Sequence, residues 1–295
     1  MSAVIDRNAA VIAEFRARNG KVGGPFEGAS LVLITTVGRR SGRPWTNPVV
    51  ALADGGRQVV FGSNAGGARD PHWYLNLLAN PQVTMEIGTD AGHVKPFATR
   101  AVPLAGDERA RYWDLQCSRD PAFRAYAAAA TTRTIPVVAL HPLDLAGDSA
   151  RGRLIGEQLV RHHDDLRAEI EQVRERFERA LGGAPHAREP QGPAEQLRRH
   201  CLTFCYHLQL HHTREDGAFS AFEREFPHLV PAITRLRAEH VVVEHALAAF
   251  EAILEQAATT TTPPRRLRDE FERVLTGLEE HFAYEEAQLL PALGR

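Results

Sequence analysis

The sequence predicts two domains of different classes: a mainly antiparallel β domain with flanking helices over residues 1–144, and an all-α four-helix bundle over 154–295. A linker is expected at 145–153, where Gly and small polar residues gather. The length of 295 residues fits about two domains. Hydrophobic spacing changes near residue 150 from short strand-like runs to helical spacing, and only three of the fourteen histidines precede that point.

The first half is expected to contain short strands separated by turns and a few helices. An amphipathic N-terminal helix, with apolar residues from Val4 to Phe15, is expected to end at Asn19-Gly20. The turns Asp54-Gly55-Gly56 and Asp90-Ala91-Gly92 each join two apolar runs, as in hairpins. The predicted strands are 30–38, 47–52, 58–62, 83–87, 94–102 and 134–140, and the further helices are 71–78 and 108–126. This order predicts a small barrel or an α+β domain.

The second half shows helical periodicity in four segments, with expected breaks at 182–193, 217–231 and 258–264. Each segment carries an apolar seam with alternating steps of three and four residues. The seams are Leu159, His163, Leu166, Ile170, Val173 and Phe177; Leu197, Cys201, Phe204, Leu208, His211 and Glu215; Ile233, Leu236, His240, Val243, Leu247 and Phe250; and Leu267, Phe271, Val274, Leu278, His281 and Glu285. Every helix therefore directs one His into the core, and two also direct a Glu there.

These inward polar residues predict a metal site. A lone His on an apolar face is usually a hydrogen-bonded core residue, but here four occur together with Glu215 and Glu285. Two ionised carboxylates in one core need positive partners, and no Lys or Arg lies on the seams. Imidazole and carboxylate without thiolate favour iron or manganese, with zinc as an alternative.

Register also separates other polar residues from the predicted ligands. His162, His207, His212 and His245 lie off their seams, so a solvated face or a supporting position behind the ligands is expected for them. Four residues could orient the ligand imidazoles from outside, namely Asp164, Glu239, Glu244 and Tyr284. Glu244, one turn after His240, could also ligate directly.

Residues 154–290 resemble a hemerythrin-like domain of the HHE type, on the pattern of His163, His211 with Glu215, Glu239-His240, and His281 with Glu285. The resemblance implies a non-haem diiron centre with both glutamates bridging and an open position for O2, NO or peroxide. Oxygen-carrying hemerythrins have a second His one turn along the third helix, and this chain has Glu244 there. Sensing, scavenging or redox chemistry is therefore favoured over reversible oxygen carriage.

Two stretches of the first half suit an anionic, planar ligand. The turn after the first strand holds Arg39, Arg40, Ser41 and Arg43, which could cradle an anionic group, although a basic turn is often only solvated. After the third strand comes the stretch 63–77, which includes Asn76. It begins with Ser63-Asn64-Ala65-Gly66-Gly67, whose glycines let the backbone approach a ligand.

With Asn19-Gly20-Lys21-Val22-Gly23-Gly24 and Arg133-Thr134-Ile135-Pro136, these stretches resemble the deazaflavin-dependent nitroreductase family over residues 4–141. The resemblance implies a split β-barrel that uses coenzyme F-420 to reduce quinones, nitroaromatics or activated double bonds. It also implies roles for particular residues. Arg39, Arg40, Ser41 and Arg43 would hold the cofactor phosphate, while Ser63, Asn64, Ala65, Gly66, Gly67, His72 and Trp73 would line the ring. Asn64 stands where a Lys is common, and Arg69 could compensate. Ser63 or Tyr126 could supply the proton, and Trp73 could instead be a core residue.

The leading hypothesis is an oxidoreductase in which reduced deazaflavin gives hydride to a small-molecule acceptor, fused to a two-iron module that binds O2, NO or peroxide. The alternatives are a sensor that regulates the reductase, an FMN-binding split barrel, and a barrel without cofactor. A net charge of −2 argues against a nucleic-acid partner. Three cysteines indicate a reducing cytoplasm, and neither a signal peptide nor a transmembrane run is expected. Whether the chain forms a homodimer stays open.

Overall fold

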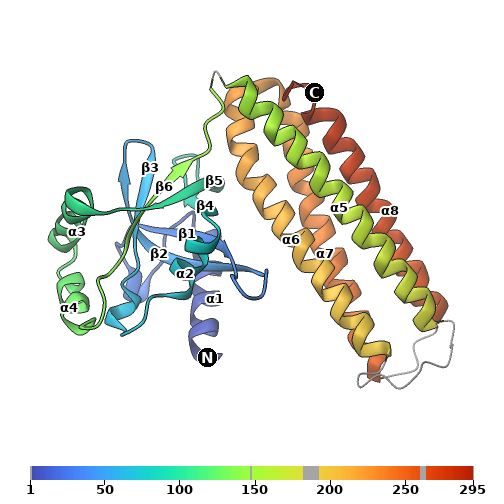
Figure 1. Ribbon diagram of the computed structural model, residues 1–295, viewed down its shortest axis with the longest axis horizontal. Coiled ribbons are helices and arrows are strands. Elements are labelled where there is room, and N and C mark those ends of the chain that lie inside the picture. The colour runs from blue at the N-terminus through green and yellow to red at the C-terminus, as the bar shows by residue number, and fades with distance from the viewer. Residues whose placement is uncertain (1, 147, 182–192, 260–263, 295) are drawn as a thin grey trace. The chain divides into compact units, whose positions relative to one another are not determined.

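The first part of the chain folds as a closed antiparallel barrel of six strands (Figure 1). The computed structural model describes residues 2–146, 148–181, 193–259 and 264–294. The strands are β1 (Leu31–Val37), β2 (Pro44–Asp54), β3 (Arg57–Phe61), β4 (Gln82–Gly88), β5 (Val94–Pro103) and β6 (Val137–Pro142). Their order around the barrel is β1-β2-β3-β6-β5-β4. All six predicted strands are present, so the expected β domain is confirmed.

The predicted hairpin between β2 and β3 is closed by two glycines. Gly55 and Gly56 have φ values of 53° and 89°, which L side chains rarely adopt. The turn sets the register in which Asp54 pairs with Arg57 and Leu52 with Val59. Glycine at both central positions is therefore a requirement of this turn.

Strand β1 is buried on both faces because its alternate residues enter two cores. Val32 and Ile34 point into the barrel interior. Leu31 and Leu33 pack on the outside with Phe15, from the helix α1 (Ser2–Ala17). Each of these side chains contributes about 1.5–3 kcal/mol through burial. The continuous apolar run of β1 is thus explained by a helix that covers the outer face.

The helix predicted over 108–126 is in fact two helices. They are α3 (Gly106–Arg119) and α4 (Ala122–Ala129), separated at Asp120-Pro121. Pro121 lacks an amide hydrogen and disfavours a helical conformation in the residue before it, and Asp120 is extended (φ −136°, ψ 99°). The remaining predicted helix is α2 (His72–Ala79), and short 3-10 turns occupy Gly24–Phe26 (η1) and Asn64–Gly66 (η2).

The second part of the chain forms four long helices. They are α5 (Ser149–Leu181), α6 (Pro193–Glu225), α7 (Val230–Thr259) and α8 (Pro264–Leu289), with the short η3 (Pro227–Leu229) before α7. The expected breaks at 182–193 and 258–264 fall largely outside the described residues. No helix in the described ranges is long and apolar enough to cross a membrane.

Two predicted helix ends differ from those observed. Helix α5 begins at Ser149, inside the expected linker, because the Asp148 carboxylate accepts the amide of Arg151 at 2.9 Å and caps the first turn. Helix α6 continues through Gly217 to Glu225 rather than ending there. One glycine inside a helix costs only about 1 kcal/mol, and the residues after it, Ala218 to Glu225, carry no proline.

The predicted seams form the interior of the helical part. One cluster contains Leu166, Ile170, Val173, Phe204, Leu208, Val243, Leu247, Phe271 and Leu278, with Val274 packed against it. The seam histidines and glutamates are also buried, with Glu285 and His163 at 0% exposure. The side chains of Phe177, Leu197, Cys201, Phe250 and Leu267 lie outside the described residues.

Candidate cofactor and metal sites

The helical part contains two adjacent groups of buried side chains that could hold metal ions. The first consists of His163, His211, Glu215 and Glu285, and the second of His212, Glu215, His240 and His281. Within each group the candidate ligand atoms all lie within 4.8 Å of one another. The structure therefore brings together all six residues that the seams predicted, from four helices.

Glu215 is the carboxylate common to both groups. Glu285 belongs to the group that contains His163, with its Oε2 atom 3.4 Å from the Nε2 atom of that ring. A carboxylate between two such groups is the arrangement that a bridged pair of ions requires.

The spacing of the nitrogens in the first group suits a common ion. The Nε2 atoms of His163 and His211 are 3.1 Å apart. Two nitrogens held at right angles by one ion at about 2.1 Å would lie about 3.0 Å apart. The two imidazoles and two carboxylates, without a thiolate, form a donor set suited to iron, manganese or zinc.

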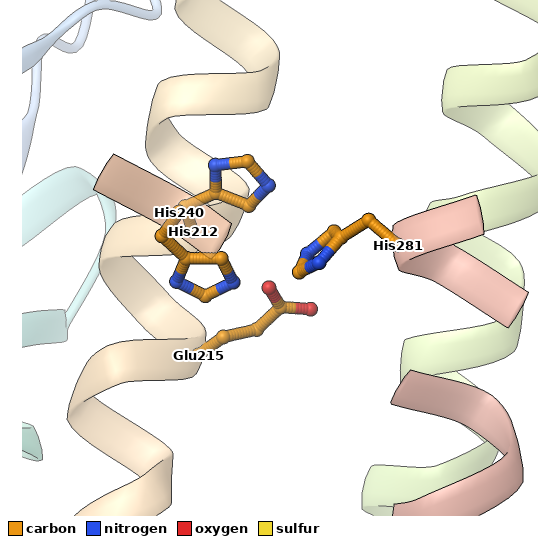
Figure 2. Close-up of side chains that lie close together, drawn as sticks. All are labelled: His212, Glu215, His240 and His281. Atoms are coloured by element: carbon orange, nitrogen blue, oxygen red, sulfur yellow. The ribbon is translucent and has the colours of Figure 1, made fainter. Parts of the chain in front are cut away.

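His212 is buried, so the first of the two roles expected for it, a place on a solvated face, is wrong. Its exposure is 7%, and its ring stacks on that of His240 with centroids 4.1 Å apart and an interplanar angle of 13°. In Figure 2 the two rings lie one above the other, and the rings of His212 and His281 converge on the carboxylate of Glu215.

Carboxylates outside the two groups hold the far nitrogens of two rings. Glu286 Oε1 lies 2.7 Å from Nδ1 of His163, and Glu239 Oε2 lies 2.9 Å from Nδ1 of His281. A carboxylate at Nδ1 favours the tautomer that leaves Nε2 to bind a metal. Burial raises the pKa of Glu239, but hydrogen bonds from His281 and Arg235 outweigh it and bring the pKa below its ordinary value.

The outer residues predicted from the sequence have different positions. Glu239 touches a ligand candidate as expected. Glu244 is exposed on α7 and lies in neither group, so its predicted role as a direct ligand is not supported. Asp164 is exposed and pairs with Arg167. The Arg235 guanidinium carbon lies over the ring of Tyr284, 3.7 Å from the centroid of that ring.

In the barrel, the basic turn joins β1 to β2 and presents its side chains to solvent. Arg39, Arg40, Ser41 and Arg43 are all exposed, which leaves the three guanidinium groups accessible to an anionic ligand. The turn is held from below by Asn76 of α2. Its Oδ1 atom accepts the Arg39 amide at 3.2 Å, and its Nδ2 atom donates to the Thr36 hydroxyl at 3.2 Å.

The Ser63–Gly67 segment has an unusual backbone. Asn64, Ala65 and Gly66 have φ values of 47°, 49° and 79°, so three consecutive residues are left-handed. Such strain in residues other than glycine persists only where surrounding structure enforces it, and it is commonest at functional sites. Here Arg133 donates to the carbonyls of three residues, at 3.0 Å to Gly62, 2.7 Å to Ser63 and 2.9 Å to Gly67.

The remaining predicted barrel residues divide between surface and core. His72 is exposed at the start of α2, whereas Trp73 is 6% exposed and belongs to the core cluster of the barrel. Tyr126 of α4 lies beside the Ser63–Gly67 segment, because a Cβ atom on Gly66 would be 3.3 Å from the Tyr126 Cα. The segment that carries Ser63 and the helix that carries Tyr126 are therefore neighbours.

Comparison with known proteins assigns the barrel. A family model described as F420H(2)-dependent quinone reductase matches residues 8–142. An F420H(2)-dependent quinone reductase of Mycobacterium tuberculosis is 33% identical over 130 residues, which are 43% of this chain and 83% of that protein. The chain belongs to this quinone reductase family. A second M. tuberculosis relative with the same family description is 36% identical over 104 residues, 35% of this chain and 82% of the relative.

The helical part of this reductase matches a second family model, the hemerythrin HHE cation binding domain, over residues 154–293. The chain is thus an oxidoreductase fused to a cation-binding domain, as the two resemblances in the sequence predicted. A solved structure of an F420-H2 dependent reductase (FDR-A) is 32% identical, covers 38% of this chain and 93% of that chain, and has a TM-score of 0.33.

The sequence did not identify four residues that touch the candidate sites. His212 was set aside by register, and Glu286 reaches His163 from another helix without any local pattern. Asn76 and Arg133 lie inside the motifs that carry the reductase resemblance, but neither was given a role. A polar Asn between the apolar residues Leu75 and Leu77 was the available signal for Asn76.

Proposed function

We propose that the reductase domain transfers hydride from reduced coenzyme F-420 to a quinone, nitro compound or other activated acceptor, and that the helical domain holds two iron ions that bind O2, NO or peroxide. The observation that carries the metal proposal is the position of Glu215 in both groups of ligand candidates. Family membership carries the reductase proposal.

The exposed turn between β1 and β2 would bind the phosphate of the deazaflavin cofactor through Arg39, Arg40, Ser41 and Arg43. When bound, the reduced deazaflavin supplies a hydride, and a quinone that takes it up with one proton leaves as the hydroquinone. The deazaflavin ring would lie against the backbone of Asn64, Ala65, Gly66 and Gly67, and His72 would lie at the edge of the ring. Trp73, in the core, is left out of this site. The hydroxyls of Ser63 and Tyr126 are the candidate proton donors.

In the helical domain one ion would be held by His163, His211 and Glu285, and the other by His240 and His281. Glu215 would contact both ions. Two iron ions would supply open coordination positions and electrons for a small oxidant, and manganese is the alternative metal. The surrounding buried leucines and phenylalanines exclude bulk water from the site.

Cofactor titration tests the reductase proposal. Purified protein is titrated with coenzyme F-420 and with FMN, and Arg40→Ala is titrated alongside. Tight binding of F-420, weakened at least several-fold in the variant, supports the proposal. Preferential binding of FMN would contradict it and identify an FMN-binding barrel.

Metal analysis tests the helical domain. About two iron or manganese ions per chain are expected, and a variant with both His211→Ala and Glu215→Ala should lose them. Full metal retention in that variant contradicts the assignment. Adding reduced F-420 without oxygen and following the diferric absorbance then tests electron transfer, and unchanged bands would instead favour a sensing module.

A further inference from the structure

The second group of ligand candidates contains three imidazoles, one of which lies outside the seam pattern. We propose that His212 is a metal ligand and supplies the third nitrogen of the second metal position, together with His240 and His281. This inference rests on the proposed two-metal centre and adds a seventh residue to its ligands. It makes the two metal positions unequal, with two imidazoles at one and three at the other.

Helix geometry explains how His211 and His212 can both face the interior. Adjacent residues on a helix point about 100° apart, so each can face a different neighbouring helix. In this bundle His211 and His212 face different helices, and both reach Glu215 on their own helix. The ring of His211 lies 4.9 Å from that of His163 on α5, while the ring of His212 lies against His240 on α7.

Distances place His212 among the ligands of the second position. Its ring centroid is 4.1 Å from that of His240 and 5.3 Å from that of His281. The ligand atoms of these three residues and of Glu215 all lie within 4.8 Å of one another. The Nε2 atoms of all three rings and both carboxylate oxygens of Glu215 are buried.

The alternative is that His212 is a core histidine that only stacks on His240. A buried imidazole of that kind usually gains its stability from hydrogen bonds to ordinary polar groups. The ligand atoms of two further imidazoles and a carboxylate lie within 4.8 Å of that of His212, and this is a donor set that borderline divalent ions select. The Nδ1 atom of His281 is already bound to Glu239, which directs its Nε2 atom to the same point.

The exposure of Glu244 supports the assignment of His212 as a ligand. The residue one turn after His240 on α7 is Glu244, which is exposed and lies in neither group of ligand candidates. Helix α7 can therefore offer only one nitrogen to the second position. His212 of α6, whose ring is stacked on that of His240, supplies the further nitrogen.

Metal content of variants of the full-length protein tests the inference. His212→Ala should lower the iron bound from about two ions per chain to about one after dialysis against a weak chelator. His207→Ala is the matched control, because His207 lies on the same helix but is exposed and paired with Glu169. Glu244→Ala is the second control, and both should keep about two ions. Circular dichroism verifies that each variant stays helical.

A rescue variant separates ligation from packing. His212→Glu places a carboxylate at the same position and should retain two ions, although it fits the stacked space poorly. Proton NMR of the cobalt(II) protein with labelled histidine counts ligand rings directly, and five shifted imidazoles are expected in the wild type against four in His212→Glu.

Two results overturn the inference. One is an unchanged metal content and cobalt spectrum in His212→Ala, and the other is four shifted imidazoles in a wild-type protein that holds two ions. Both leave the two-metal centre intact. A wild-type protein with well under two ions per chain would instead refute the centre and this inference together.

Discussion

The Nδ1 atom of His163 lies 2.7 Å from the Oε1 atom of Glu286, and Arg167 donates to the same carboxylate oxygen at 3.1 Å. This chain of contacts fixes the imidazole with its Nε2 atom toward His211 and Glu285. A carboxylate behind a metal-bound imidazole raises its basicity and holds its orientation. The geometry makes Glu286 a positioning residue for the proposed metal centre.

Replacing Glu286 should weaken metal binding without removing a ligand. In Glu286→Ala we expect about a 10- to 100-fold loss of affinity, because the ring of His163 loses its fixed tautomer. Glu286→Gln keeps an acceptor oxygen and should lose less. Competition with a coloured chelator measures the affinity. Glu280→Ala, an exposed residue of the same helix, is the control, and an equal affinity in all four proteins would refute the role.

Gly66 and Gly92 form a matched pair for testing the predicted deazaflavin segment. Their φ values are 79° and 82°, so alanine costs each about 1–2 kcal/mol in backbone strain. A Cβ atom on Gly92 meets nothing within 4 Å, whereas on Gly66 it would lie 2.8 Å from the Ala129 Cβ. Gly66→Ala should therefore be the more destabilising change, and it alone should weaken binding of coenzyme F-420.

Urea unfolding followed by tryptophan fluorescence measures this difference. The three tryptophans, Trp45, Trp73 and Trp113, all lie in the barrel, so the signal reports that domain. Equal destabilisation of the two variants, with equal cofactor affinity, would show that the segment tolerates displacement from α4.

Periodicity predicted the helical site because a 3.6-residue repeat fixes which side chains share a face. That repeat predicts His163, His211, His240, His281 and both glutamates, which the structure brings together. It excluded His212 because a single apolar seam is narrower than the arc that a helix presents to several neighbours in a bundle. Glu286 could not be found this way, since it lies off the apolar seam of α8 and reaches His163 on another helix.

In the barrel, turn residues and apolar runs together predicted the strands. Gly55-Gly56 located the β2–β3 hairpin, and the run Ser30 to Gly38 located β1. One helix is expected over 108–126, but Pro121 separates α3 from α4. The hydrogen bonds of Arg133 join it to the carbonyls of Gly62 and Ser63, about seventy residues away in the chain. These segments come together in the folded barrel.

The Asp54 carboxylate makes barrel stability depend on pH. Hydrogen bonds from Tyr112 and then Arg57 hold the pKa of Asp54 below its ordinary value of 3.8. A carboxyl whose pKa is lower in the folded state stabilises the fold above the unfolded-state pKa, and this contribution disappears as the pH falls through the folded-state pKa. Asp54→Asn should therefore lower the urea midpoint at pH 7.

The difference between wild type and Asp54→Asn should shrink as the pH falls below about 4. Asp90→Asn, in an exposed turn, is the control and should show no such dependence. The same tryptophan signal measures all three proteins. A difference that stays constant from pH 7 to pH 3 would assign the effect to side-chain packing.

The Arg133 guanidinium should be essential for the shape of the Ser63–Gly67 segment. It donates to three backbone carbonyls and to the Asp70 carboxylate at 2.8 Å, and its side chain is 9% exposed. A lysine carries the same charge but cannot form this fork, so Arg133→Lys leaves several partly buried carbonyls without their donor. We expect a loss of about 2–4 kcal/mol of barrel stability.

Hydrogen exchange locates the effect of Arg133→Lys. Faster exchange of the amides of Gly66 and Gly67, with the strands unchanged, is expected because the left-handed backbone loses the contacts that enforce it. Binding of coenzyme F-420 should weaken about tenfold or more, since the segment must then be ordered on binding. Arg124→Lys, exposed on α4, is the matched control. Unchanged exchange and affinity in Arg133→Lys would mean that packing against α4 alone holds the segment, and that Arg133 contributes only charge.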